Sequence, residues 1–153
     1  MAKLFISIAI CQAAGILGSF FTRTSVSTWY RTLVKPPFAP PNWLFAPVWI
    51  TIFVMMGISL YLIIKPDNAM AANKKALTVF AFQLIFNILW SAAFFGLRSP
   101  LAGLAVIFAL WLLIIFNIVE FYKISRAAGI LLIPYLLWVS FAFVLNFEYW
   151  RLN

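Results

Sequence analysis

Three side chains within one apolar stretch, Gln83, Asn87 and Trp90, are spaced so that they could act together. Their separation of i, i+4 and i+7 puts them on one face of a helix. Polar side chains are costly in such a stretch, so their presence needs a physical reason. They could orient the polar edge of a ligand in an apolar cavity, or Gln83 and Asn87 could join helices through interhelical hydrogen bonds. The sequence favours neither interpretation over the other.

Aromatic residues are the second group that could bind a ligand, because the chain has seven Trp, five Tyr and seventeen Phe. Four of them lie at the ends of apolar stretches and suit an interfacial belt: Trp29, Tyr30, Trp43 and Trp150. Trp138 instead lies half-way along the last apolar stretch, where a tryptophan more often fills core than binds a cofactor. Together with Trp90, it could still form a stacking wall for a flat apolar ligand.

The segment from Trp29 to Trp49 combines aromatic residues with five prolines, at positions 36, 37, 40, 41 and 47. Proline fixes φ and lowers the entropy cost of ordering a loop, so this segment could fold back as a lid. Arg31 and Lys35 lie in the same segment and could face a ligand carboxylate.

Charged residues exclude several classes of membrane protein. Glu120 and Glu148 fall near the ends of apolar stretches, each three residues before a cation, which predicts interfacial ion pairs. Because no ionisable residue lies in the middle of a stretch, a proton-coupled drug pump and a retinal protein are both disfavoured.

The chain has no histidine, which removes the usual general base, zinc ligand and haem ligand. Haem iron could find only Cys11, a methionine such as Met55 or Met56, or a tyrosine. We therefore expect no metal site, no redox haem and no conventional catalytic residues.

The amino-acid composition indicates whether water or lipid surrounds these residues. Apolar and aromatic residues make up 66% of the 153 residues, charged residues make up 9%, and the mean hydropathy is +1.07. A soluble domain is about half apolar and one quarter charged. The sequence predicts an all-α integral membrane protein, a single domain over residues 1–153. Five helices are expected at about 4–21, 44–64, 76–97, 101–119 and 127–150, with a ligand-capping loop at 22–43.

The net charge of +8 does not indicate nucleic-acid binding, because the cations lie between apolar blocks, as they do beside lipid head groups. The lipid bilayer is thus the expected partner. Six cations on the N-terminal side and five on the other leave the orientation, and the identity of the membrane, open.

Four motifs together resemble the TspO/MBR family, whose members are also called tryptophan-rich sensory proteins or peripheral-type benzodiazepine receptors. The motifs are the Trp29–Trp49 segment, Gln83-x3-Asn87-x2-Trp90, the segment from Leu131 through Pro134-Tyr135 and Trp138 to Phe141, and the tail from Leu145 to Arg151. They span nearly the whole chain.

This resemblance implies a five-helix bundle, often a homodimer, with a ligand cavity capped by the first loop. It implies porphyrins such as protoporphyrin IX and haem, sterols, and synthetic hydrophobic compounds as ligands, with no obligatory cofactor. The positions that match the family's ligand-binding residues are Trp29, Trp43, Trp49, Asn87, Trp90 and Trp138, with Tyr30 and Tyr135 as further wall residues.

Some details depart from the family or add to it. Leu145, Tyr149 and Arg151 fit a proposed cholesterol-contact pattern. Phe121-Tyr122 stands where many members have Trp-Tyr, and Trp111 has no role that the family assigns.

Three functions therefore stand as hypotheses. The first is a receptor or transporter for porphyrin-like ligands in tetrapyrrole regulation or stress sensing. The second, the one enzymatic alternative, is light-dependent porphyrin degradation through Trp138 and Trp90. The third is a sterol- or lipid-responsive partner of other membrane proteins.

Overall fold

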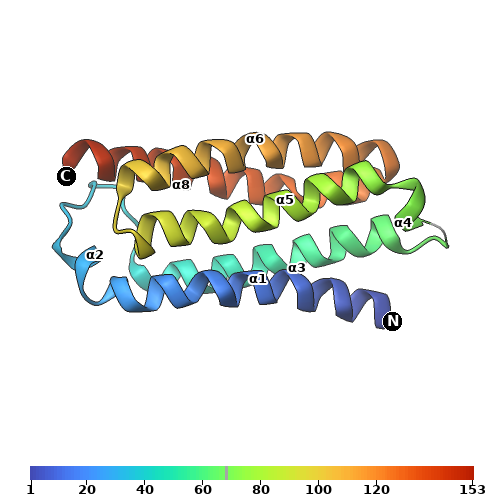
Figure 1. The fold of residues 1–153 in the computed structure, drawn as a ribbon, viewed down its shortest axis with the longest axis horizontal. Helices are drawn as coiled ribbons and strands as arrows, with labels where there is room; N and C mark the ends of the chain where they lie inside the picture. The colour runs from blue at the N-terminus through green and yellow to red at the C-terminus, as the bar shows by residue number, and fades with distance from the viewer. Residues whose placement is uncertain (68) are drawn as a thin grey trace.

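The computed structural model describes residues 1–67 and 69–153, and every regular element in this part of the chain is helical (Figure 1). The elements in chain order are α1 (Ala2–Val26), α2 (Trp29–Thr32), η1 (Asn42–Leu44), α3 (Phe45–Ile64), α4 (Ala69–Ala72), α5 (Lys74–Ser91), η2 (Ala92–Gly96), α6 (Pro100–Ile124), α7 (Arg126–Leu131) and α8 (Ile133–Leu152).

Within the described residues, five helical stretches are long and apolar enough to cross a membrane. They run side by side along the long axis of the molecule, with the two termini at opposite ends (Figure 1). The short helix α2 lies at the end that holds the C-terminus, and α4 lies at the other end. The predicted all-α, five-span, multi-pass membrane fold is confirmed.

Helix α1 is longer than the predicted 4–21, because its polar last turns continue the helix instead of starting a loop. The hydroxyl groups of Thr22, Thr24 and Thr28 donate to the carbonyls of Gly18, Phe21 and Thr24, at 3.4, 3.0 and 2.9 Å. Hydroxyls that bond back to the preceding turn need no water, so helical structure is compatible with this polar sequence.

Two further boundaries differ from the prediction. Helix α6 continues past residue 119 to Ile124, and the expected single helix 127–150 is divided at Leu132 into α7 and α8. Pro134 explains the break, because it has no N–H for the carbonyl of Ile130 and its ring would crowd that carbonyl. The backbone tightens at this point, and the Leu132 N–H donates to Gly129 at 3.2 Å.

Helix α5 ends in the π-helical segment η2, where the Leu97 N–H donates to the carbonyl of Ala92 at 2.8 Å. Arg98 follows with a φ of 53°, and the Ser99 hydroxyl then caps α6 by accepting from Ala102 at 3.1 Å. Such π segments often occur at functional sites. Here the segment places Phe94 and Phe95 beside the cavity described below.

Helices α1 and α3 touch closely at two places along their length. A Cβ atom added to Gly57 would lie 2.5 Å from the Cα of Ile8, and one added to Gly15 would lie 2.6 Å from the ring of Phe53. Small residues allow this approach, as is usual between helices in lipid.

Interhelical hydrogen bonds tie the other helices together. The Trp111 indole donates to Ser140 at 2.9 Å, which joins α6 to α8 and gives Trp111 a structural role. The Ser59 hydroxyl donates to the carbonyl of Ala128 at 2.7 Å and joins α3 to α7. Large apolar side chains such as Phe20, Phe82 and Leu137 are exposed on the outside, where lipid is the solvent.

Candidate functional site

A cavity of about 600 Å³ lies among α1, α3, α5, η2 and α8, at the end of the bundle that carries α2. This volume lies in the range of roughly 300–1,000 Å³ that is usual for small-molecule sites. Its lining is mostly apolar and aromatic, with a few polar groups. The residues on which the argument depends are Gln12, Ser19, Thr22, Arg23, Tyr30, Asn42, Phe45, Ala46, Trp49, Phe53, Asn87, Trp90, Phe94, Leu145, Asn146 and Tyr149.

One wall of the cavity is a row of four aromatic rings with similar orientations. Phe53 stacks on Trp49 at 5.6 Å and 28°, Trp49 meets Trp90 at 6.4 Å and 33°, and Trp90 meets Phe94 at 5.9 Å and 30°. Neighbouring ring planes thus differ by 28–33°, and the four rings form one contiguous aromatic row. A surface of this kind is suited to a flat, conjugated ligand.

The polar side chains behind this wall bond mainly to one another, although the buried Gln83 Nε2 has no partner among the described residues. The Asn87 amide donates to the Tyr135 hydroxyl at 2.8 Å, and that hydroxyl donates to Gln83 at 2.9 Å. The Trp90 indole donates to Asn146 at 3.0 Å. Gln83 and Asn87 therefore join helices α5 and α8, which agrees with the interpretation that they form interhelical hydrogen bonds. Asn87 also lines the cavity, which the interpretation as a ligand-orienting residue requires.

Above the cavity, α2 is held to α8 by a pair of buried tyrosines. The hydroxyls of Tyr30 and Tyr149 lie 2.7 Å apart, and the two side chains are 5% and 1% exposed. Burial raises the pKa of Tyr30, and its hydrogen bond to Tyr149 raises it further, so Tyr30 stays neutral. Trp29 adds an edge-to-face contact with Phe94 at 5.6 Å.

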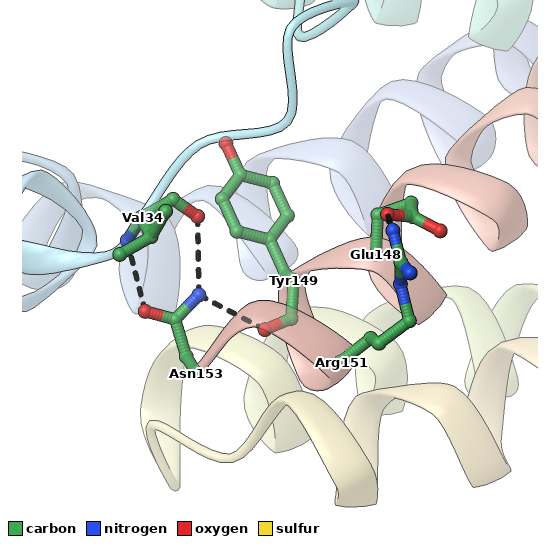
Figure 2. Close-up of polar contacts among 5 residues, drawn as sticks. All are labelled: Val34, Glu148, Tyr149, Arg151 and Asn153. Atoms are coloured by element: carbon green, nitrogen blue, oxygen red, sulfur yellow. Dashed lines mark hydrogen bonds and ion pairs between the residues drawn. The ribbon is translucent and has the colours of Figure 1, made fainter.

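The segment after α2 is fastened by Asn153, as Figure 2 shows. The Asn153 side-chain carbonyl accepts from the Val34 N–H at 2.8 Å, and its amide donates to the Val34 carbonyl at 3.1 Å. The same amide donates to the carbonyl of Tyr149 at 3.0 Å. The segment from Trp29 to Val34 is therefore fixed at two points to the end of α8, and we refer to it as the lid.

Six of the residues singled out from the sequence line this cavity: Tyr30, Trp49, Asn87, Trp90, Leu145 and Tyr149. Tyr135 stands directly behind the wall, 6.3 Å from the ring of Trp49 and bonded to Asn87. Trp29 is in the lid, packed on the aromatic row. The structure thus gathers residues from distant parts of the chain around one space.

Trp43 and Trp138 lie elsewhere. Both line a second, shallower groove on the outer side of α3 and α8. Phe45 separates the two spaces, because it lines the cavity and also packs edge-on against Trp138 at 5.9 Å. Trp90 and Trp138 therefore do not form two sides of one wall.

The cations expected to steer a ligand also lie away from the cavity. Arg31 is exposed on α2, and the Lys35 ammonium lies 5.3 Å from the centre of the Tyr30 ring. Arg151 pairs with Glu148 at 2.6 Å on the exposed side of α8 (Figure 2). Leu145 and Tyr149 instead line the cavity. The residues of the sterol pattern are thus divided between two faces.

Sequence reasoning missed several lining residues, of which Arg23, Phe53, Phe94 and Asn146 matter most. Asn146 had a detectable signal, because it lies one residue after Leu145 and three before Tyr149, on the same helix face. Arg23 was assigned to a loop, and only the extension of α1 to Val26 brings it onto the cavity side of a helix.

Five membrane-crossing helices around an aromatic cavity define a polytopic membrane protein with an internal ligand-sized site. Residues 7–151 match the TspO/MBR family, and the chain belongs to that family of membrane proteins. It is 45% identical over 150 residues to tryptophan-rich protein TspO of Chlorobaculum tepidum, covering 98% of this chain and 95% of that protein. It is 47% identical over 151 residues to tryptophan-rich protein TspO of Archaeoglobus fulgidus, covering 99% and 97%. It is 34% identical over 140 residues to translocator protein of Bos taurus, covering 91% and 83%.

Proposed function

We propose that this protein is a membrane receptor or transporter that binds porphyrin-like ligands such as protoporphyrin IX or haem in the cavity beneath the lid. The observation that carries the proposal is the row formed by Phe53, Trp49, Trp90 and Phe94. Its rings form a continuous aromatic surface, and flat conjugated molecules gain contact area on such a surface.

The polarity of the cavity supports the same class of ligand. Asn87, Trp90 and Asn146 each donate a hydrogen bond to another protein group, so this part of the lining offers mainly contact area. A ligand with an extended apolar body loses little there, whereas a strongly polar one would be poorly solvated. Sterols and synthetic hydrophobic compounds satisfy this condition too, and Leu145 and Tyr149 would contact them inside the cavity.

Light-dependent degradation is a second candidate, and one observation favours it. The Trp90 ring forms part of the cavity surface, so a porphyrin bound there would lie against an oxidisable indole. Trp138 would act only through Phe45, which stands between it and the cavity. We therefore expect Trp90 to matter more than Trp138 in any photochemistry of the bound porphyrin.

Titration of the purified protein with protoporphyrin IX in darkness, followed by tryptophan fluorescence, tests the proposal. Saturable quenching is expected, with a large part of it lost in Trp90→Phe and little of it lost in Trp138→Phe. Quenching that survives in Trp90→Phe combined with Trp49→Phe would reject the cavity as the site. Illumination of the same samples then separates binding from degradation, because only degradation removes the visible absorbance of the porphyrin faster than detergent alone.

A further inference from the structure

Several neutral polar groups of the cavity lining are bonded within the protein. Asn87, Trp90 and Asn146 each donate one hydrogen bond to another protein group. Along α1, the hydroxyls of Ser19 and Thr22 donate to carbonyls of their own helix. None of these groups offers a charged donor to an acidic group on a ligand.

Among the described residues that line the cavity, Arg23 alone is charged. It lies in the last turn of α1, its side chain is exposed, and it lines the mouth of the cavity next to Thr22 and close to the lid. Within residues 1–67 and 69–153, its guanidinium makes no hydrogen bond or ion pair, so its donors face the cavity mouth and solvent. A guanidinium matches the planar, two-oxygen geometry of a carboxylate.

The acidic residues of the protein do not neutralise this charge. Asp67 lies 3.9 Å from Lys3 and is two residues before α4, which is at the end of the bundle away from α2. Glu120 pairs with Lys75, in the first turn of α5, and with Lys123. Glu148 is engaged by Arg151 at 2.6 Å. The cavity mouth is thus a positive site without a protein counter-ion, in a protein with a net charge of +8.

The two neighbouring cations are placed differently. Arg31 and Lys35 do not line the cavity, and the Lys35 ammonium lies over the ring of Tyr30, 5.3 Å from its centre. Arg23 also lies at the C-terminal end of α1, where a positive charge interacts favourably with the helix dipole. That interaction requires only a charge near the last turn, so it does not account for the position of Arg23 on the cavity wall.

We propose that Arg23 is a specificity-determining residue that binds the acidic group of an amphipathic ligand at the cavity mouth, so that the cavity selects ligands with an aromatic or apolar body and a carboxylate at one end. The proposal rests on the proposed function, since it assumes that the cavity holds the ligand. It fixes the ligand's direction: the conjugated body lies on Trp49 and Trp90, and the acid points to the lid end of α1.

The experiment compares protoporphyrin IX with its dimethyl ester, which has the same ring system but no carboxylate. Both are titrated in darkness against the wild-type protein, Arg23→Gln, Arg23→Lys and the control Arg31→Gln. Arg31→Gln removes the same charge from the same side of the bundle without touching the cavity. The quantity of interest is the ratio of the two Kd values in each protein, because the ratio cancels any general effect on folding or on detergent partition.

We expect Arg23→Gln to weaken binding of the acid about five- to tenfold, as for one charge-assisted hydrogen bond at an open site, and to leave binding of the ester unchanged. Arg23→Lys keeps the charge but lacks the two-donor geometry of the guanidinium, so its affinity for the acid should fall between those of Arg23→Gln and wild type. The affinity of Arg31→Gln should match that of wild type. Equal loss for both ligands, no loss in Arg23→Gln, or an equal loss in Arg31→Gln would each overturn the role of Arg23. If the wild-type protein bound neither compound, the proposed function itself would fail, which is a distinct result.

Discussion

The buried tyrosine pair gives a prediction whose size follows from the structure. Tyr30→Phe removes one of two hydroxyls that lie 2.7 Å apart in an environment where both side chains are at most 5% exposed. The variant loses a hydrogen bond and leaves the Tyr149 hydroxyl buried without that partner. Such an unpaired group costs about 1–3 kcal/mol, which corresponds to a roughly 5- to 150-fold change in an equilibrium constant.

The cost should fall on the lid and not on the whole bundle, since Tyr30 belongs to α2, a four-residue helix at one end of the bundle. Hydrogen–deuterium exchange, followed by mass spectrometry of peptides covering residues 27–41, measures the free energy of lid opening. We expect exchange in this segment to accelerate by roughly 5- to 150-fold in Tyr30→Phe and in Tyr149→Phe, with α6 unchanged. Tyr122→Phe, at the other end of the bundle, is the matched control.

The double variant supplies the decisive comparison. When both hydroxyls are removed, no unpaired group remains, so Tyr30→Phe with Tyr149→Phe should open no more easily than either single variant. Effects that simply add, or single variants indistinguishable from wild type, would show that this hydrogen bond does not hold the lid, and the reasoning would be wrong.

Other predictions follow from the lid and from the close contact between α1 and α3. Asn153→Ala should accelerate exchange at the Val34 amide about three- to tenfold, because two partly exposed hydrogen bonds are lost, and peptides from α6 report whether the effect stays local. Gly57→Val should destabilise the bundle by about 1–3 kcal/mol through the clash with Ile8, seen as a lower midpoint when a thiol-reactive dye follows thermal unfolding; an unchanged midpoint would contradict the packing. Because the pKa of Tyr30 is raised in the folded protein, its contribution to lid stability is complete below about pH 10, the ordinary tyrosine value, and declines as the pH rises toward the higher folded value. Loss of lid protection between pH 7 and 9 in the wild type but not in Tyr30→Phe would contradict that direction.

The membrane fold was predictable because it depends on composition and length, which need no knowledge of packing. Helix ends were less predictable, since local side chains decide them. The threonines at 22, 24 and 28 extend α1 into a polar segment by bonding to the preceding turn. Pro134 was visible in the sequence, yet its position alone did not show that the helix would divide at Leu132.

The candidate site was predictable where residues share one helix face. Asn87 and Trp90 face the cavity as their spacing suggested, and Trp49 joins them from α3. Trp138 shows the limit of periodicity. It lies four residues before Ala142, which lines the cavity, but Phe45 from another helix occupies the intervening space. Contacts between segments far apart in sequence decide such positions, and a single sequence does not record them.

Arg23 shows a different limit. A cation next to an apolar stretch usually lies at the membrane surface, and nothing in its own neighbourhood distinguishes it from Arg31. Its position on the cavity wall depends on the continuation of α1 to Val26 and on the contacts of α1 with α3 and η2.

The central claim, that the cavity between α1, α3, α5 and α8 holds the ligand, is tested most directly by filling it. Ala46 lines the cavity on α3, whereas Val48 on the same helix lines the outer groove with Trp43 and Trp138. The binding of protoporphyrin IX, measured from its visible absorbance in darkness, should be weakened at least tenfold by Ala46→Phe and left unchanged by Val48→Phe. The opposite pattern, with loss in Val48→Phe and full binding in Ala46→Phe, would place the ligand in the outer groove and contradict the account.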